Sequence, residues 1–451
     1  MQQPENEIVL VAHLHDKLPV GQTALLGLQH VLAMDVYVVP FIIASVLGLA
    51  VADSATLIQS AFIAAGIATY IQSKWCMRLP VVQGPSYVPI GAILAIAFAS
   101  GGGTEGLATV FGALIPGAII VALLGWPTGI FHRVIKKLVP PIVGGTIILV
   151  VGIALMPVAL KESVFAVHGD ATVGGNILLA AVSATVLVAA MIAGISMGSR
   201  GVWLRLAAVI LALAAGTLVA SFMGRFSAQG IADASWLTLP RIAFLTLDIK
   251  FSFSAILTML VVYAVVLAET TGTWFAVGAV MGKEITDSRL DRGATGEGLG
   301  CLVSALVGST PVTGYSSNAG VIAITGIGSR SVVAAAGIML VLFGLVGKLG
   351  AAIASIPQPV IGGVFGVLCA IIAMNGFRVV RASPLNERNM LVVGLPILLA
   401  LFATLIPSDY LRTLPDLVQY LLGSSIAFGA VGAILLHQIL PERSAAEFAG
   451  D

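Results

Sequence analysis

Fourteen apolar stretches, separated by short polar segments, follow one another from about residue 20 to residue 440. The hydrocarbon core of a bilayer is about 30 Å thick, so a helix needs roughly 20 apolar residues to cross it. The pattern therefore predicts an all-α polytopic membrane protein with fourteen transmembrane spans. The stretches begin near Ala24, Ala55, Leu79, Gly106, Val139, Asn176, Val202, Leu257, Thr295, Val312, Ser331, Pro359, Asn389 and Leu417.

The third and tenth stretches open with residues that interrupt a helix. Residues 79–91 read LPVVQGPSYVPIG, residues 309–320 read STPVTGYSSNAG, and each is followed by only a short apolar run. Non-helical backbone at membrane depth persists only where protein or a wet cavity satisfies its polar groups. We expect two half-helices that direct unpaired N–H groups into a cavity, with Ser86 and Ser317 as their N-caps. The alternative is that Pro and Gly only kink two continuous helices.

The two interrupted stretches occupy equivalent places, third in the first seven and third in the second seven. This correspondence is typical of an inverted repeat, and paired interrupted segments point to the binding site of a transporter. The pattern thus favours two inverted repeats of seven spans.

Composition limits the class of protein further. Apolar residues make up 58% of the chain and charged residues 10%, with a net charge of +1. So few charges exclude a soluble globular protein, and no basic patch supports nucleic-acid binding. The sequence Gly194-Ile195-Ser196-Met197-Gly198 resembles a hydrolase motif, but it lies in an apolar helix without partners. Neither an enzyme, nor a metal site, nor a cofactor is predicted.

Lys and Arg divide unequally between alternate loops, which predicts the orientation. The richer side is expected to be cytoplasmic, as are both termini. It contains Lys17, Lys74, Arg78, Arg133, Lys136, Lys137, Arg200, Arg205, Lys283, Arg289, Arg292, Arg330, Arg378, Arg381, Arg388 and Arg443. The other side contains Lys161, Arg225, Arg241, Lys250 and Arg412.

Three acidic residues lie within predicted spans, where a charge requires a reason. Glu269 lies midway along the eighth span with Thr273 on the same helical face, and it can accept hydrogen bonds or carry a proton. A purely structural carboxylate is the alternative. Glu297 opens the ninth span, where an interfacial, snorkelling role competes with a functional one. For Asp35 in the first span, function and structural pairing stay equally open.

Residues 317–326, SNAGVIAITG, resemble the hallmark motif of the nucleobase–ascorbate transporter family through Asn318, Gly320, Thr325 and Gly326. Further likenesses extend from about residue 20 to residue 440. They are Gln29-His30 in the first span, Gln83-Gly84-Pro85-Ser86-Tyr87 in the third, Glu269 with Gly272 in the eighth, and Gly308-Ser309-Thr310-Pro311 before the tenth.

The resemblance implies a core domain of spans 1–4 and 8–11 and a gate domain of spans 5–7 and 12–14. The corresponding boundaries are a cytoplasmic tail at 1–20, core at 21–126, gate at 127–250, core at 251–356, gate at 357–440, and a cytoplasmic tail at 441–451. It also implies a homodimer in the bacterial inner membrane, in contact with lipid.

The activity that the resemblance implies is proton-coupled import of a nucleobase, with the proton as the coupling ion. Substrate would lie between the third and tenth spans, at the positions of Tyr87, Glu269, Thr273, Ser317 and Asn318. Glu269 and Glu297 would take part in proton coupling. The supporting residues would be Gln29, His30, Asp35, Ser86, Gly320 and Thr325.

This sequence departs from the family pattern in ways that bear on the substrate. Ser317 replaces Gln or Glu, Thr273 replaces the His of uracil carriers, and Asp35 replaces a neutral residue. These changes favour a purine such as xanthine or uric acid. A uracil symporter, an inorganic-anion transporter of the same fold, and a non-transporting membrane enzyme or scaffold are the alternatives. A midplane carboxylate at Glu269 argues against an anion.

Overall fold

A computed structural model describes residues 10–167, 169, 171–239 and 242–441. Helices account for 74% of the structure, as the apolar pattern predicts. The predicted cytoplasmic tails at 1–20 and 441–451 fall partly outside the described residues.

Most predicted spans appear as one continuous helix. They are α3 (Val51–Tyr70), α5 (Gly103–Gly125), α7 (Pro141–Pro157), α8 (Val173–Ser196), α9 (Val202–Phe222), α12 (Phe253–Val280), α13 (Asp287–Val307), α15 (Arg330–Gly344), α17 (Gln358–Val380) and α18 (Glu387–Leu405). Shorter helices connect or interrupt them. They are α6 (Phe131–Leu138), α10 (Gln229–Asp233), α11 (Ala243–Thr246), α16 (Gly347–Ala354) and α19 (Ser408–Leu411). Short π-helical turns extend α3 to Trp75 and α7 to Glu162.

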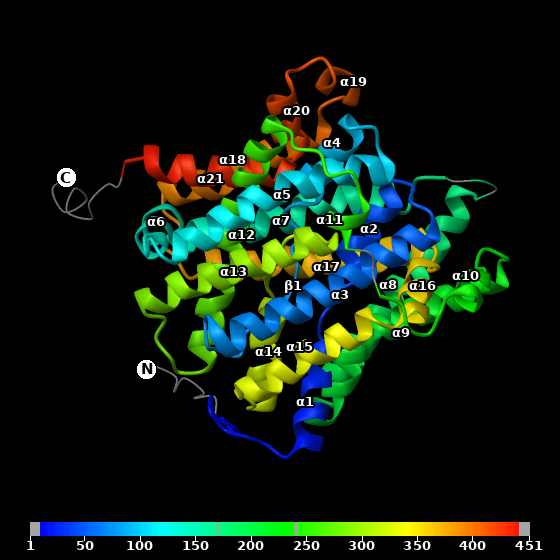
Figure 1. Ribbon diagram of the computed structural model, residues 1–451, viewed down its shortest axis with the longest axis horizontal. Coiled ribbons are helices and arrows are strands. Elements are labelled where there is room, and N and C mark those ends of the chain that lie inside the picture. Colours follow the sequence, from blue (N-terminus) through cyan, green and yellow to red (C-terminus); the bar gives the residue numbers. More distant parts are fainter. Residues whose placement is uncertain (1–9, 168, 170, 240–241, 442–451) are drawn as a thin grey trace.

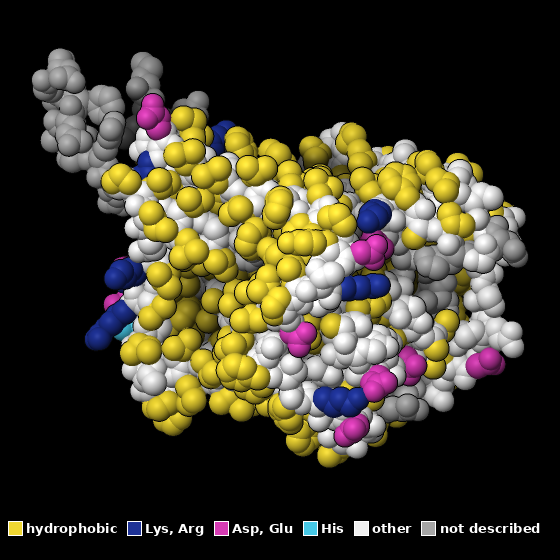
Figure 2. Space-filling model, turned by 90° about the horizontal axis from the view of Figure 1, so that it is seen from above, with side chains coloured by type: hydrophobic (Ala, Val, Ile, Leu, Met, Phe, Trp, Pro, Cys, Tyr) yellow, Lys and Arg dark blue, Asp and Glu magenta, His cyan; other side chains and the backbone are white. Residues whose placement is uncertain are grey.

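Among the described residues, eight helices are long and apolar enough to cross a membrane, or nine if a bent pair counts as one span. Four predicted spans consist instead of shorter pieces, and α13 and α15 are not among the eight, so length and composition alone do not establish fourteen crossings. Figure 2 shows hydrophobic side chains over much of one face, with charged side chains toward its left edge and right half. This surface is that of an integral membrane protein.

The third and tenth stretches are discontinuous, as predicted. Each begins with a short strand, β1 (Gln83–Pro85) or β2 (Val312–Gly314), and ends with a half-helix, α4 (Ile90–Ala99) or α14 (Ser316–Thr325). The strands pair antiparallel, with Gly84 opposite Thr313. Figure 1 shows β1 near the centre of the molecule, among the long helices.

The first predicted span is also broken, which the sequence analysis did not predict. Helix α1 (Val20–Leu32) ends before Asp35, and α2 (Val38–Val46) begins after it. Pro40 lies in the first turn of α2, where a missing N–H costs no helical hydrogen bond. This proline was the signal for the break.

The last predicted span is bent by 89° between α20 (Asp416–Gly423) and α21 (Ser425–Ile439). The Ser424 side chain accepts a hydrogen bond from the Ala427 amide and caps α21. A new cap at this point allows the second helix to start in a new direction.

Two predicted N-caps are wrong. Helix α4 begins after Pro89, and α14 begins after Tyr315. Ser86 lies in the loop before α4 and accepts a hydrogen bond from the Val88 amide, whereas Ser317 lies inside the first turn of α14.

Candidate functional site

The paired strands are the centre of the candidate site. The Ser86 amide donates to the Pro311 carbonyl at 2.8 Å, and the Tyr315 amide donates to the Val82 carbonyl at 3.0 Å. These bonds extend the ladder beyond both strands. Short strands at membrane depth are stable here because each supplies hydrogen-bond partners to the other.

Helix α12 holds β2 in place through two threonines. The Thr270 hydroxyl accepts from the Gly314 amide at 2.9 Å, and the Thr273 hydroxyl donates to the Gly314 carbonyl at 2.8 Å. Both threonines are buried. The structure thus directs Thr273 toward the backbone, and its predicted contact with substrate stays a prediction.

Glu269 lies where α12 meets both interrupted segments. The Ser86 hydroxyl donates to its carboxylate at 2.8 Å, and Thr313 of β2 lies beside it. Glu269 is half-buried, whereas Ser86 is fully buried. The structure therefore brings together the third span, the eighth span and the tenth span at one acidic group.

Tyr87, the next residue after Ser86, contacts a different carboxylate. Its hydroxyl donates to Asp35 at the break between α1 and α2. Its ring stacks on Phe365 of α17, with centroids 5.7 Å apart and planes 14° from parallel. Tyr87 thus joins the break between α1 and α2 to α17.

Glu297 is fully buried in α13, so the interfacial interpretation is wrong for this residue. The Gln72 amide donates to it at 3.2 Å and to the Gly293 carbonyl at 2.9 Å. Thr270 and Gln83 also lie beside the carboxylate. The sequence analysis missed Gln72. Its position as a polar residue near the end of an otherwise apolar stretch could have identified it.

The residues of the hallmark motif mainly shape the backbone. The Asn318 side chain donates to the Pro80 carbonyl and lies beside His30. Thr325 donates to the Val321 carbonyl, and Gly326 ends α14 with a φ of +69°. A left-handed residue at this place is typical of a helix C-terminus and favours glycine.

One face of α14 is open. Ser317 and Gly320 are exposed, and apart from the neighbouring backbone of α14 no atom lies within 4 Å of a Cβ built on Gly320. The first amides of a helix have no partners within that helix. Of the other predicted supporting residues, Gln29 and His30 are buried in α1.

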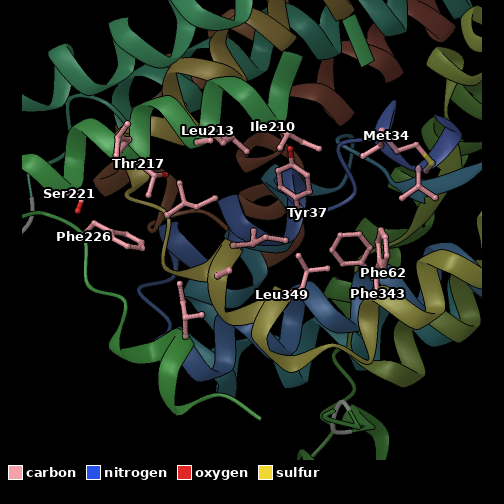
Figure 3. Close-up of a pocket in the computed structure, with 18 residues that line it drawn as sticks. Met34, Tyr37, Phe62, Ile210, Leu213, Thr217, Ser221, Phe226, Phe343 and Leu349 are labelled. Atoms are coloured by element: carbon pink, nitrogen blue, oxygen red, sulfur yellow. The ribbon is translucent and has the colours of Figure 1, made fainter. Parts of the chain in front are cut away.

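A cavity of about 560 Å³ lies next to this site and not at Glu269. Figure 3 shows Tyr37, Phe62, Leu213 and Leu349 around it, which come from the α1–α2 break, α3, α9 and α16. Met34 lines the cavity and also approaches Gly84 of β1. The cavity therefore borders the strand pair, and its wall is mainly apolar.

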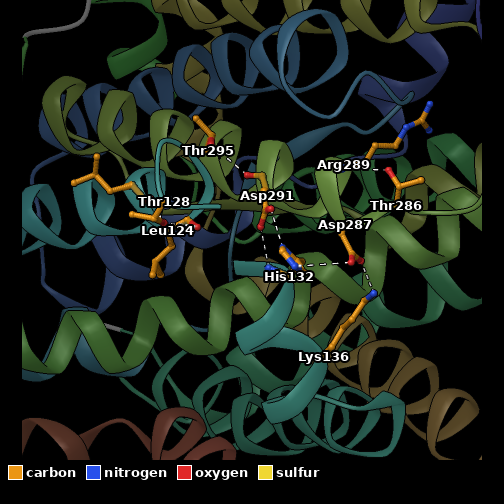
Figure 4. A network of polar contacts seen from close by, with 10 residues as sticks. Leu124, Thr128, His132, Lys136, Thr286, Asp287, Arg289, Asp291 and Thr295 are labelled. Atoms are coloured by element: carbon orange, nitrogen blue, oxygen red, sulfur yellow. Dashed lines mark hydrogen bonds and ion pairs between the residues drawn. The ribbon is translucent and has the colours of Figure 1, made fainter. Parts of the chain in front are cut away.

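A polar network lies at one end of α13, away from the strands. Figure 4 shows His132 between Asp287 and Asp291, with Lys136 beside Asp287. The His132 ring is 2.8 Å from Asp291, and its backbone amide donates to the same carboxylate at 2.9 Å. These contacts attach α6 to α13. No group of three or more metal-ligating side chains occurs among the residues that the structure describes.

Two interrupted membrane segments that meet a carboxylate within a helical bundle define a class of protein, the membrane transporters. The chain belongs to the permease family whose model, Xan_ur_permease, matches residues 21–408. This is the nucleobase:cation symporter 2 family, to which the nucleobase–ascorbate resemblance pointed. Membership makes the protein a transporter and not an enzyme.

The chain is similar over nearly its whole length to characterised permeases. It is 32% identical to the uric acid permease PucK of Bacillus subtilis, across 92% of this chain and 95% of that protein. It is 30% identical to the xanthine permease XanP of Escherichia coli, across 96% and 95% of the two chains.

Solved structures of other transporters share the fold. The transmembrane domain of the cyanobacterial bicarbonate transporter BicA superposes with a TM-score of 0.65 at 16% identity, covering 87% of this chain and 98% of that one. SLC26A9 gives a TM-score of 0.59 at 13% identity, covering 92% and 65%.

Proposed function

We propose that this protein imports an oxopurine of the xanthine or uric acid type together with protons. Its similarity to a uric acid permease and a xanthine permease supports a purine substrate. The observation that carries the proposal is the hydrogen bond between Ser86 and Glu269, which joins the third span to an acidic group beside β2. Thr273 and Ser317, which replace residues of uracil carriers, favour a purine over uracil.

The proposed substrate lies beside Glu269 and the open start of α14. An oxopurine presents N–H donors and C=O acceptors along its edges. An ionised Glu269 accepts from ring N–H groups, and the first two amides of α14, those of Ser316 and Ser317, donate to a ring carbonyl. Ser317 is exposed at the same place, while Asn318 holds the segment through Pro80. Tyr87 forms another wall of this site.

Proton coupling is assigned to the same carboxylate. Protonation of Glu269 removes a negative charge and changes one acceptor into a donor, which alters how it binds both Ser86 and substrate. Release of the proton after substrate leaves inward then links the two fluxes. Glu297 lies deeper, fully buried against Gln72, and provides a second protonatable group in contact with Thr270, the neighbour of Glu269.

Equivalent packing pairs support fourteen spans arranged as two inverted repeats. Helices α3 and α15, the second and eleventh spans, pack together, and so do α13 and α5, the ninth and fourth. Likewise α8 packs on α9, and α18 packs on α21. We propose the core and gate domains of the family on this basis.

The proposed assembly is a homodimer in the bacterial inner membrane with both termini in the cytoplasm. Helices α8, α9 and α18 are largely exposed within one chain. The buried share of the 18-residue apolar stretch is 28% in α8, 22% in α9 and 28% in α18. Apolar helix faces of this kind require lipid or a second copy as cover.

The test is uptake by purified protein in liposomes with an imposed proton gradient. Labelled xanthine and uric acid are expected to accumulate, whereas uracil and sulfate are not. Dissipating the gradient should abolish accumulation. Uptake of sulfate alone would support an anion transporter, and accumulation of xanthine that ignores the gradient would contradict proton coupling.

A further inference from the structure

Two consecutive residues each hold a carboxylate from a different helix. The Ser86 hydroxyl donates to Glu269 of α12, and the Tyr87 hydroxyl donates to Asp35 between α1 and α2. The loop between β1 and α4 therefore donates hydrogen bonds to two acidic groups. Tyr315, directly before α14, donates its hydroxyl to the carbonyl of Pro85 at 2.9 Å, immediately before these two residues. Asp35 and Glu269 are thus bonded to neighbouring residues of one loop, next to the start of α14.

Asp35 keeps acceptor capacity that the protein does not use. Tyr87 is its one side-chain donor among the described residues, and the other interaction is with its own backbone amide. A carboxylate offers about four acceptor positions, so the second oxygen can take a further donor. Asp35 is half-buried, and the helix is interrupted around it, which frees this short side chain from the helix surface.

Resting on the function proposed above, we infer that Asp35 is a specificity-determining residue, which accepts an N–H from the imidazole ring of a bound oxopurine. Glu269 accepts from the six-membered ring of the same molecule. Two acceptors that bind N–H groups on the two fused rings select a purine, because uracil carries both of its N–H donors on the six-membered ring and has none at the position of the imidazole N–H.

A role for Asp35 only as the support of Tyr87 makes a different prediction. In Asp35→Asn, the amide oxygen can still accept from Tyr87, but the NH2 group that replaces the second oxygen only donates and cannot accept from the ligand. In Tyr87→Phe, the support is lost while both oxygens of Asp35 remain available, and the ring can still stack on Phe365. The two variants therefore separate substrate contact from positioning.

The experiment measures competition by xanthine, 7-methylxanthine and 9-methylxanthine for labelled xanthine in liposomes that contain the purified protein. A methyl group at either position removes the N–H donor of the imidazole ring, because the other nitrogen of that ring then carries no hydrogen. Hydrogen bonds to charged groups imply a preference of roughly 10- to 100-fold for xanthine in the natural protein. Asp35→Asn should reduce this ratio to a few-fold, and Tyr87→Phe should leave it within about two-fold of the natural ratio.

The steric effect of each methyl group is common to the natural protein and its variants. It therefore cancels when their preferences for xanthine over the methylated bases are compared. Asp35→Ser, which keeps one oxygen as a hydroxyl but lacks the second carboxylate oxygen, serves if the Asn variant does not fold. An unchanged ratio in these Asp35 variants overturns the inference while the proposed function stands. An equal loss in Tyr87→Phe overturns it in favour of positioning. Failure of the natural protein to transport any base overturns the proposed function itself.

Discussion

The two interrupted segments share a plan but differ in how they are used. Each is a three-residue strand followed by a ten-residue half-helix. Before α4, Ser86 is fully buried and bonded to Glu269, and Gly84 packs against the Tyr315 ring. In α14, by contrast, Ser317 and Gly320 face open space.

The difference assigns separate tasks to the two segments. The segment of β1 and α4 is a support, because the side chains of its connecting loop contact other parts of the protein. Ser86 binds Glu269, and Tyr87 binds Asp35 and stacks on Phe365. In the other segment, Thr313 of the buried β2 lies beside the same carboxylate, and α14 presents exposed residues. Substrate on this account binds against α14 and depends on β1 for the position of Glu269. The following changes test that division, from the largest expected effect to the smallest.

Glu269→Gln should have the largest effect, because the carboxylate serves both segments and the proposed substrate. We expect at least a 100-fold loss of proton-driven xanthine accumulation, with the melting temperature little changed, since Gln can still accept from Ser86. Uptake in liposomes measures the first quantity and thermal unfolding the second. Glu105→Gln, which removes an exposed partner of Lys250, is the matched control and should retain transport. Undiminished, gradient-dependent accumulation in the Glu269 variant would reject the assignment.

Gly84→Ala should destabilise the support. A Cβ there would lie 2.8 Å from the Tyr315 ring and 3.1 Å from Met34, and displacing the ring endangers its 2.9 Å hydrogen bond to the Pro85 carbonyl. We expect a loss of about 1–3 kcal/mol in the free energy of unfolding, measured by denaturant titration in detergent, and a matching loss of transport.

Gly320→Ala is the comparison on the other segment. A methyl group there meets no atom within 4 Å, and alanine favours a helix over glycine by roughly 1 kcal/mol. Folding stability should be kept or raised, while xanthine affinity falls several-fold because the methyl group occupies the open face. Equal destabilisation by the Gly84 and Gly320 changes would contradict the division between the segments.

Ser317→Gln should have the smallest effect. The longer side chain enters open space, so unfolding should be unaffected, while a new amide near the substrate changes the relative affinities for xanthine and uric acid a few-fold. Competition between the two bases measures this change. A Ser317 variant that alters unfolding but not substrate preference would show that this face packs against protein.

The sequence contained much of this arrangement. Pro and Gly near Ser86 and Ser317 predicted both interruptions, because Pro removes a helical hydrogen bond and both residues lower the stability of a helix. Glu269 was recognisable as an unexplained charge in an apolar helix. The break at Asp35 was missed because Ala33-Met34-Asp35-Val36-Tyr37 has neither Gly nor Pro, and the informative residue, Pro40, comes later.

Contacts between distant residues could not be predicted from local pattern. Gln72 and Glu297 form a hydrogen bond although they are 225 positions apart in the sequence. Tyr87 stacks on Phe365 only because α17 packs beside the loop that precedes α4. Thr273 lay on the predicted face of α12, but nothing in the sequence indicated that its hydroxyl would bond to Gly314. Local rules locate the interruptions, whereas tertiary packing decides which side chains remain free.

The most direct test of the central claim is an experimental structure of the purified protein with xanthine. The account predicts the base within hydrogen-bond distance of Glu269 and of the first amides of α14, with Ser86 still bound to the carboxylate. Xanthine in the apolar cavity beside Leu213 and Leu349, without contact to Glu269, would contradict it.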